Sequence, residues 1–233
     1  MSPAIKVPRV VALVPAHDEG DRVGRTVRAL ASLEEVGEVI VVDDGSRDAT
    51  AAVALAAGAT VLRIPRRLGK GGALEGALRR LPPADVWLFA DADLQESASE
   101  LVPVLREVVE GRADLAVAVL PPQVSGGLGT VRRFAARAIL LLTGFASSQP
   151  LSGQRAVRGA ALGSCRPLAS GFGVETAMTI DALRAGLVVR EVPAPGLAHR
   201  ATGRDLTGFV HRGRQGLDIL RAVAVRAVRR RRA

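Results

Sequence analysis

Short apolar runs alternate along this chain with longer stretches in which apolar residues recur at helical spacing, and no other feature restricts the fold as strongly. The runs predicted to be strands are residues 10–14, 38–42, 59–64, 86–90 and 115–120. The stretches predicted to be helices are residues 21–33, 48–57, 71–81 and 97–110. Because the runs are mainly apolar and do not alternate with polar residues, both faces of the sheet must be covered. The sequence therefore predicts a Rossmann-like α/β fold with a mostly parallel sheet flanked by helices.

After about residue 121 this rhythm changes, beginning with the Pro/Gly-rich segment PPQVSGGLG. The later elements are predicted to be a helix at 130–143, a short extended piece at 152–157, a helix at 174–185, a strand at 187–192, a loop at 195–208 and a basic helix to the end. The chain has no internal repeat, and no linker is long enough to separate independent domains. We expect one domain over 1–233, with a first half at about 8–120, a second half at about 121–208 and a basic amphipathic helix at 209–233.

The charge of the chain is strongly basic and comes almost entirely from arginine. The formal net charge is +9, and Lys6 and Lys70 are the only lysines among 32 basic residues. A surface rich in guanidinium groups favours phosphates, anionic lipid headgroups or nucleic acid. Aromatic residues make up 3% of the chain and none is tyrosine, which argues against base stacking.

Cys165 is the only cysteine, so an internal disulfide is excluded and a small core residue is the expected role. The N-terminal segment lacks the apolar core of a signal peptide. We therefore expect a cytoplasmic protein.

Polar groups follow the ends of the predicted strands, where ligands of open α/β sheets bind. The four segments are PAHDE at 15–19, DDGSRD at 43–48, RRLGKGG at 66–72 and DADLQ at 91–95. In DDGSRD the carboxylates could accept hydrogen bonds from a pyrimidine or a ribose, while Ser46 and Asp48 can cap the next helix. The alternative is that the segment is only a helix cap. In RRLGKGG a glycine turn, Lys70 and a helix start suit an anion, but the spacing is not that of a Walker loop.

DADLQ is the strongest local signal. Asp91 and Asp93 can direct carboxylate oxygens at a cation, and Gln95 offers a third oxygen. Hard oxygen donors favour Mg²⁺ or Mn²⁺ completed by substrate phosphates. The alternative is a solvated turn in which Asp93 or Ser97 caps the next helix.

PAHDE, VVDDGSRD, GKGGALEGAL, FADADLQ, SGQRAV and GFGVETAMTIDALRAGL, taken in order, resemble the family 2 glycosyltransferases of GT-A fold. The likeness extends over about 10–193 and is strongest to the branch of dolichyl- and polyprenyl-phosphate sugar transferases. It implies a nucleotide-sugar half at about 8–120, an acceptor half at about 121–208 and a UDP- or GDP-linked sugar donor.

The resemblance also implies roles for individual residues. Asp91, Asp93 and Gln95 match the metal motif, with Asp91 and Asp93 beside the donor and Asp93 at the reaction centre. The positions implied to contact substrate are Pro15, Ala16 and Glu19 against the nucleotide, Asp44 on the base or ribose, Lys70 on the diphosphate, and Ser152 and Arg155 beside the acceptor phosphate. No role is assigned to His17, for which a surface position is expected.

The resemblance implies an inverting transfer in which the acceptor displaces the nucleoside diphosphate. A phosphate acceptor needs cations more than a base, because it is already anionic at neutral pH. The candidate cations are Arg132, Arg133, Arg155, Arg200 and Arg204. Glu175 is a candidate base, although it could instead orient Arg155 or cap its helix.

Three functions remain open at this point. The first is transfer to a polyprenyl phosphate at the cytoplasmic membrane face, favoured by the apolar segment 134–145 and by the basic helix 209–233, which suits an anionic membrane surface. The alternative reading of that helix is packing on the domain. The second function is transfer to a small soluble phosphorylated acceptor such as 3-phosphoglycerate. The third, from another class, is an arginine-rich nucleic-acid-binding module; nucleic acid is not the expected partner.

Overall fold

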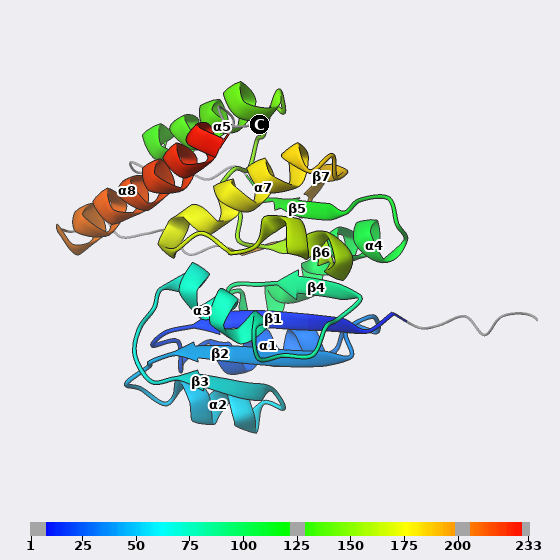
Figure 1. Cartoon of the computed structure of the whole chain (residues 1–233). Coiled ribbons are helices and arrows are strands. Elements are labelled where there is room, and N and C mark those ends of the chain that lie inside the picture. The colour runs from blue at the N-terminus through cyan, green and yellow to red at the C-terminus, as the bar shows by residue number, and fades with distance from the viewer. Residues whose placement is uncertain (1–7, 122–128, 199–205, 230–233) are drawn as a thin grey trace, which may run out of the picture.

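A computed structural model of the chain describes residues 8–121, 129–198 and 206–229. A seven-stranded sheet lies at its centre, in the order β3-β2-β1-β4-β6-β5-β7 (Figure 1). The strands are β1 Val10–Ala16, β2 Glu38–Asp44, β3 Thr60–Ile64, β4 Val86–Phe89, β5 Leu115–Val119, β6 Arg155–Arg158 and β7 Val189–Pro193. β6 is antiparallel to both of its neighbours, and the other pairs are parallel. The prediction of a mostly parallel α/β sheet is confirmed.

Successive residues of each strand enter opposite layers, so the sheet has a core on each face. On β1, Val10, Ala12 and Val14 face one core while Val11 and Leu13 face the other. The first core is covered by α1 Val23–Ala31, α2 Thr50–Ala56, the 3₁₀ helix η1 Gln95–Leu101 and α4 Val102–Val109. The second is covered by α3 Lys70–Leu78, α6 Gly159–Leu162 and α7 Val174–Arg184. Burial on both faces is why β1, β4 and β5 read as unbroken apolar runs.

The helix predicted at 97–110 forms as two pieces, η1 and α4. Pro103 is the second residue of α4. Proline has no N–H to donate to the preceding turn, so it suits the start of a helix and not its interior. Two further 3₁₀ turns, η2 Gly163–Cys165 and η3 Gly171–Gly173, lead toward α7.

Two longer helices, α5 Gly129–Thr143 and α8 Leu206–Arg229, contact each other and α7 on the outer side of the second half (Figure 1). α8 thus begins a few residues before the expected 209. Ile219, Ala222 and Arg226 bury one face of α8. Arg226 pairs with Asp181 of α7, with Nε 2.8 Å from Oδ1. This face of α8 therefore packs on the domain, as the alternative interpretation of the helix predicts.

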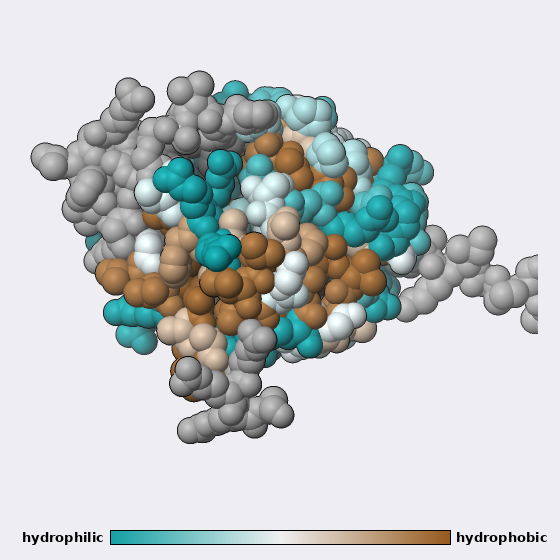
Figure 2. All heavy atoms as spheres, turned by 90° about the horizontal axis from the view of Figure 1, so that it is seen from above, coloured by the Kyte–Doolittle hydropathy of each residue, from teal (hydrophilic) through white to brown (hydrophobic). Residues whose placement is uncertain are grey.

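The opposite faces of α5 and α8 carry exposed apolar side chains. They are Phe134, Leu140 and Leu141 on α5 and Leu217, Leu220, Val225 and Val228 on α8. Figure 2, seen from the side of these helices, shows apolar residues gathered over this face. Within the described residues, neither α5 nor α8 nor any other helix combines the length and hydropathy needed to cross a bilayer.

Candidate active site

One edge of the sheet collects the polar segments that follow the strands. β1, β2, β3 and β4 are parallel, so their carboxyl ends meet at this edge. β6 runs the other way, and its first residue, Arg155, is paired with Phe89, the last residue of β4. The segment before β6 therefore arrives beside the segment after β4. The antiparallel direction of β6 is what brings residues 152–154 to Asp91.

A lysine and two carboxylates from three elements form the centre of the candidate site. Lys70 is the first residue of α3, Asp91 follows β4, and Glu175 is the second residue of α7. Lys70 Nζ lies 2.6 Å from Asp91 Oδ1 and 2.8 Å from Glu175 Oε1. The structure thus joins three residues that the sequence predicted separately.

The charge of Lys70 is maintained by its two partners. Burial of the ammonium lowers the pKa of Lys70, but the nearby Asp91 and Glu175 carboxylates outweigh this effect and raise the pKa above its usual value. Lys70 is therefore a permanent cation at neutral pH. Glu175 is a buried carboxylate whose side chain faces Lys70.

Gln154 completes this cluster, and sequence reasoning did not assign it a role. Its amide Nε2 donates to Asp91 Oδ2 at 2.7 Å, and the residue is 1% exposed. Ser152 Oγ lies 3.4 Å from Gln154 Oε1. Ser152, expected beside an acceptor phosphate, is itself buried and faces Gln154. Gln154 occupies the variable position of the S-G-x-R pattern. The sequence therefore gives no sign that its side chain contacts Asp91.

The DADLQ segment is held in place by Thr26, a buried residue of α1. The Thr26 hydroxyl donates to the Ala92 carbonyl at 2.8 Å and accepts from the Gln95 N–H at 2.8 Å. Asp93, on this loop, and Gln95, the first residue of η1, are both half-buried. Ser97 donates to the Leu94 carbonyl instead of capping a helix. No local signal within the predicted helix indicated Thr26, because its partners lie far along the chain.

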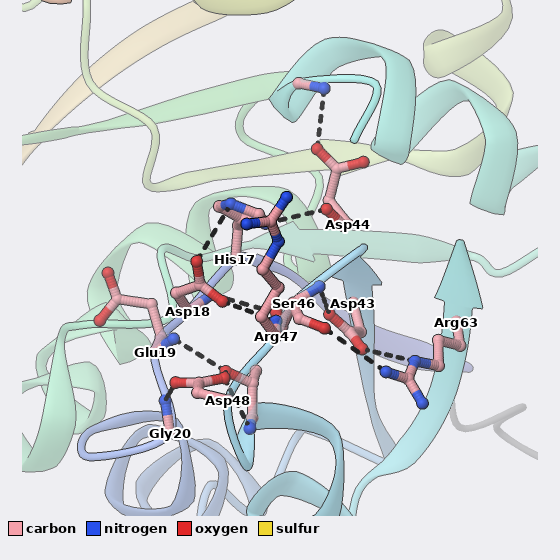
Figure 3. A network of polar contacts seen from close by, with 12 residues as sticks. His17, Asp18, Glu19, Gly20, Asp43, Asp44, Ser46, Arg47, Asp48 and Arg63 are labelled. Carbon is pink, nitrogen blue, oxygen red and sulfur yellow. Dashed lines mark hydrogen bonds and ion pairs between the residues drawn. The ribbon is translucent and has the colours of Figure 1, made fainter. Parts of the chain in front are cut away.

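A second network joins the segments after β1 and β2 (Figure 3). The Ser46 hydroxyl accepts from the Asp18 N–H at 3.0 Å, so Ser46 ties the two loops together and does not cap α2. Asp48 does receive the Thr50 N–H at the start of α2, at 2.9 Å, and also the Gly20 N–H. The N-cap position of α2 is occupied by Ala49, and no side chain caps the helix there. The capping interpretation is therefore wrong for Ser46, and Asp48 instead holds the turn just before α2.

His17 belongs to this network and not to the open surface. Its Nδ1 lies 2.9 Å from the Asp44 carbonyl oxygen, which can only accept, so Nδ1 carries the proton of this hydrogen bond. Its Nε2 lies 3.3 Å from Asp18 Oδ2. His17 is thus half-buried, and its ring links the segment after β1 to the end of β2.

Asp44 is buried and spans from β2 to the loop before Lys70. Its two oxygens accept the N–H groups of Leu68 and Gly69, each at 2.7 Å. Asp43 accepts the Ser46 N–H at 2.9 Å, and its other oxygen lies 3.2 Å from Arg63 Nε. In this structure Asp44 positions the start of α3, so a direct contact with a base or ribose stays a prediction.

Arg155 lies in the interior at 2% exposed, away from the position expected for a residue that touches an acceptor. Its Nε donates to the Ser152 carbonyl at 2.6 Å, and Nη1 donates to the Glu175 carbonyl at 2.8 Å and to Thr179 Oγ1 at 2.9 Å. Burial lowers the pKa of Arg155 to about 10. These are the contacts of a positioning residue that ties the start of β6 to α7. Its link to Glu175 is through the main chain, so the Glu175 carboxylate does not orient it.

The remaining predicted positions fall in several places. Pro15 and Ala16 end β1 beside Val42 and Asp43. Glu19 pairs with Arg22 at 3.2 Å, and Figure 3 shows its carboxylate directed away from Asp43 and Asp44. Arg132 and Arg133 are exposed on α5, and Arg200 and Arg204 lie outside the described residues.

Cys165 is buried, and burial raises the pKa of its thiol to about 12. The expected core role is confirmed.

The donor set at this edge fits a hard divalent cation that shares its coordination with a substrate. Asp91 and Asp93 supply carboxylate oxygens, the ligands that Mg²⁺ and Mn²⁺ prefer. Over the described ranges, no three His, Cys, Asp or Glu side chains form a group that would hold a metal. A cation here would depend on ligands from elsewhere, as is usual where substrate phosphates complete the shell.

A mixed sheet of this order, with carboxylates and a lysine at the edge beyond β4, defines a nucleotide-sugar-dependent glycosyltransferase of GT-A type. The sequence pattern described as Glycosyl transferase family 2 matches residues 11–159. This chain belongs to glycosyl transferase family 2.

The chain is similar to several named glycosyltransferases. It is 32% identical to a glucosyl-3-phosphoglycerate synthase of Mycolicibacterium smegmatis, over 93% of this chain and 78% of the relative. It is 27% identical to glycosyltransferase AglJ of Haloferax volcanii, over 79% of this chain and 61% of that protein. The crystal structure of glucosyl-3-phosphoglycerate synthase from Mycobacterium tuberculosis, in complex with Mn²⁺, UDP and phosphoglyceric acid, superposes with a TM-score of 0.78. That match has 27% identity and covers 97% of this chain and 84% of the other.

These findings confirm the enzyme class and the fold, and they decide between the function classes. An enzyme of this family is not the arginine-rich nucleic-acid-binding module of the third hypothesis. The expectation of Mg²⁺ or Mn²⁺ agrees with the mycobacterial structure, which holds Mn²⁺. Among the acceptors, the relatives favour the small phosphorylated acid over the polyprenyl phosphate.

Proposed function

We propose that this enzyme transfers a glucosyl group from UDP-glucose to 3-phosphoglycerate. The observation that carries the proposal is the similarity, along almost the whole chain, to synthases that make glucosyl-3-phosphoglycerate. Solved structures of the M. tuberculosis enzyme hold UDP, Mn²⁺ and phosphoglyceric acid together. The Lys70–Asp91–Glu175 cluster supplies, at the sheet edge, the charged groups that this chemistry needs.

The donor end of the site is assigned to the segment after β4. Asp91 and Asp93 would hold a divalent cation, which when bound would stabilise the negative charge of the departing UDP. Lys70 adds a fixed positive charge beside Asp91, since its ammonium is held by two carboxylates. A charge already in place at the leaving group lowers the barrier without reorganisation during the reaction.

With 3-phosphoglycerate as the acceptor, the phosphate of the acceptor is a recognition group and not the nucleophile. In 3-phosphoglycerate the nucleophile is the hydroxyl of carbon 2, and the phosphate and carboxylate serve for recognition. A phosphate monoester carries about −1.5 to −2 charge at neutral pH, so a basic acceptor half suits it. Arginines of that half, Arg200 and Arg204 among them, remain the predicted recognition groups.

A hydroxyl nucleophile must lose its proton as it attacks, unlike a phosphate. Glu175 is a carboxylate placed at the central cluster, and its base role stays a prediction. An inverting displacement puts such a base opposite the leaving group. The configuration of the product, read from the anomeric proton coupling by NMR, tests the prediction of inversion.

The experiment that tests the proposal offers acceptors in competition. Purified enzyme with Mn²⁺ and UDP-glucose, or GDP-glucose as a second donor, is incubated with 3-phosphoglycerate, with glycerate lacking the phosphate, and with a polyprenyl phosphate in detergent. We expect turnover only with the combination of UDP-glucose as donor and 3-phosphoglycerate as acceptor. Transfer to the polyprenyl phosphate and not to 3-phosphoglycerate would overturn the proposal in favour of the lipid acceptor.

Peripheral membrane association is a separate prediction that the relatives do not support. It depends on the exposed apolar residues of α5 and α8 and on exposed arginines such as Arg133 and Arg221 near them. Flotation with anionic and with zwitterionic vesicles, using L217S/L220S as the comparison, measures it. If the variant and the parent bound anionic vesicles to the same extent, this face of α5 and α8 would have no role in membrane association.

A further inference from the structure

Both carboxylate oxygens of Asp91 are engaged by donors from other elements, and the two donors differ in charge. Lys70 Nζ lies 2.6 Å from Oδ1, and Gln154 Nε2 lies 2.7 Å from Oδ2. Lysine orients the carboxylate and also compensates its charge. The amide of Gln154 orients it and leaves the charge in place, which preserves the attraction of Asp91 for a cation.

The orientation of the Gln154 amide follows from the groups on either side of it. An ionised carboxylate can only accept, so the amide nitrogen must face Asp91. The amide oxygen then faces Ser152, whose hydroxyl lies 3.4 Å from it. Ser152 is held in turn by Arg155, whose Nε donates to the Ser152 carbonyl at 2.6 Å. The amide is therefore set by the segment that enters β6.

Gly153 provides the space in which this arrangement fits. A Cβ at this position would lie 2.3 Å from Lys70 Nζ and 2.8 Å from Asp91 Oδ2. The Lys70–Asp91 pair is thus packed directly against the Gly153 main chain, and a side chain here would displace it. The close approach, and not the backbone angles, requires glycine.

We propose that Gln154 is a positioning residue for the donor end of the site, holding Asp91 so that it binds the divalent cation that would accompany the diphosphate of the nucleotide sugar. The Ser152–Gly153–Gln154 segment would then serve the donor, whereas the resemblance placed it beside the acceptor phosphate. This inference rests on the proposed function only in that Asp91 is taken as a ligand of the cation.

The test uses two substitutions that keep the size of the side chain. Gln154→Met removes the amide donor, and Gln154→Glu replaces it with a second carboxylate facing Asp91. Isothermal titration with UDP, with and without Mn²⁺, measures donor-end binding without any acceptor or turnover. We expect both variants to bind UDP in the presence of Mn²⁺ about 10–100-fold more weakly, the range seen when groups that orient metal ligands are removed. KM for the acceptor should stay within about twofold of the parent value.

Gln149→Met is the matched control, because Gln149 lies in the same loop and its amide donates to the Leu120 carbonyl instead of to Asp91. Thermal melting of all three variants checks that they fold. A pure packing role predicts that Met and Glu at 154 both retain nucleotide binding, and that result would overturn the proposal. So would unchanged UDP affinity with a raised acceptor KM, which would return the segment to the acceptor.

Failure of the proposed function gives a different pattern from failure of this inference. A parent enzyme that binds UDP with Mn²⁺ but does not glucosylate 3-phosphoglycerate refutes the acceptor, and the titrations still decide the role of Gln154. Should Gln154→Met melt before assay temperature, the same titration on Gln154→Glu decides it.

Discussion

Lys70 and Glu175 form an ion pair of 2.8 Å between the first turn of α3 and the first turn of α7. The two helices belong to different halves of the chain, and this ion pair connects them at the edge of the sheet. Lys70 also contacts Asp91 at 2.6 Å, so one ammonium connects a predicted donor ligand with a candidate acceptor base. The predicted donor and acceptor ends of the site therefore share the ammonium of Lys70.

Replacing Lys70 by methionine should reduce kcat by about 10²–10³-fold, the usual effect of removing one preorganised charge at a developing anion. Asp91 and Glu175 would also lose their common counter-ion. Steady-state kinetics with UDP-glucose measure the effect, and Arg80→Met, at an exposed residue just after α3, is the control. A Lys70→Met enzyme with parental kcat would remove Lys70 from the mechanism.

Asp91→Asn and Asp93→Asn should each abolish the dependence of UDP binding on Mn²⁺, because an amide is a far weaker ligand for a hard cation than a carboxylate. Calorimetry across a Mn²⁺ series provides the measurement. Glu96→Gln removes one exposed charge next to the motif and should change nothing. Parental Mn²⁺ affinity in both aspartate variants would contradict the metal assignment.

The stabilising contribution of Glu75 should be lost when the carboxylate is protonated in acid. Burial raises the pKa of Glu75, but hydrogen bonds from Arg166, the Leu168 N–H and Arg79 outweigh this and lower the pKa from 4.5 to about 2. A depressed pKa means stability that is present above pH 4.5 and is lost as the pH falls toward 2. Glu75→Gln should be less stable than the parent at neutral pH, and the difference should shrink as the pH falls through that window. Urea unfolding at several pH values checks this, and a pH-independent difference would contradict it.

Arg155→Met should lower the free energy of unfolding by about 2–3 kcal/mol, because two carbonyls and a hydroxyl lose their donor inside the protein. Chemical denaturation measures it. A direct contact with the acceptor phosphate predicts instead a variant of parental stability whose KM for 3-phosphoglycerate rises strongly. Comparing 3-phosphoglycerate with glycerate separates the two interpretations.

Arg226→Met should loosen α8 and cost about 3 kcal/mol, since it leaves the Asp181 carboxylate without its guanidinium partner. Activity should fall as well, because α8 also holds the turn before α7 through Asp218, which accepts the Phe172 N–H at 3.3 Å. Arg221→Met, on the exposed face of α8, is the matched control. If the Arg226 variant unfolded at the same urea concentration as the control, α8 would not depend on this pair.

A large part of the fold could be predicted because its signals are local. β1 and β2 begin at the predicted residues, Val10 and Glu38, since strands buried on both faces need a mainly apolar run. The division between η1 and α4 was missed although Pro103 is visible in the sequence, because apolar spacing continues through it. Asp91, Lys70 and Glu175 were singled out because each stands at the end of a strand or the start of a helix.

The contacts among these residues could not be predicted in the same way. Thr26 and Gln154 have partners far away in the chain, so nothing in their own neighbourhoods distinguishes them. Arg155 appears in a recognisable stretch, yet its burial depends on α7 packing over the start of β6. A motif shows that a residue is present at a strand end, but not which way its side chain points.

The amino-acid order by itself determined the strands, the helices and the chemical types of the groups between them, because apolar periodicity and short polar motifs are properties of neighbouring residues. Tertiary structure alone decided that β6 runs antiparallel to β4 and so places Gln154 against Asp91. It also decided that Lys70 bridges two carboxylates and that Arg155 is enclosed. Strand direction and helix packing are set by the burial of the whole core, and they fix the distances on which charge and hydrogen bonding depend.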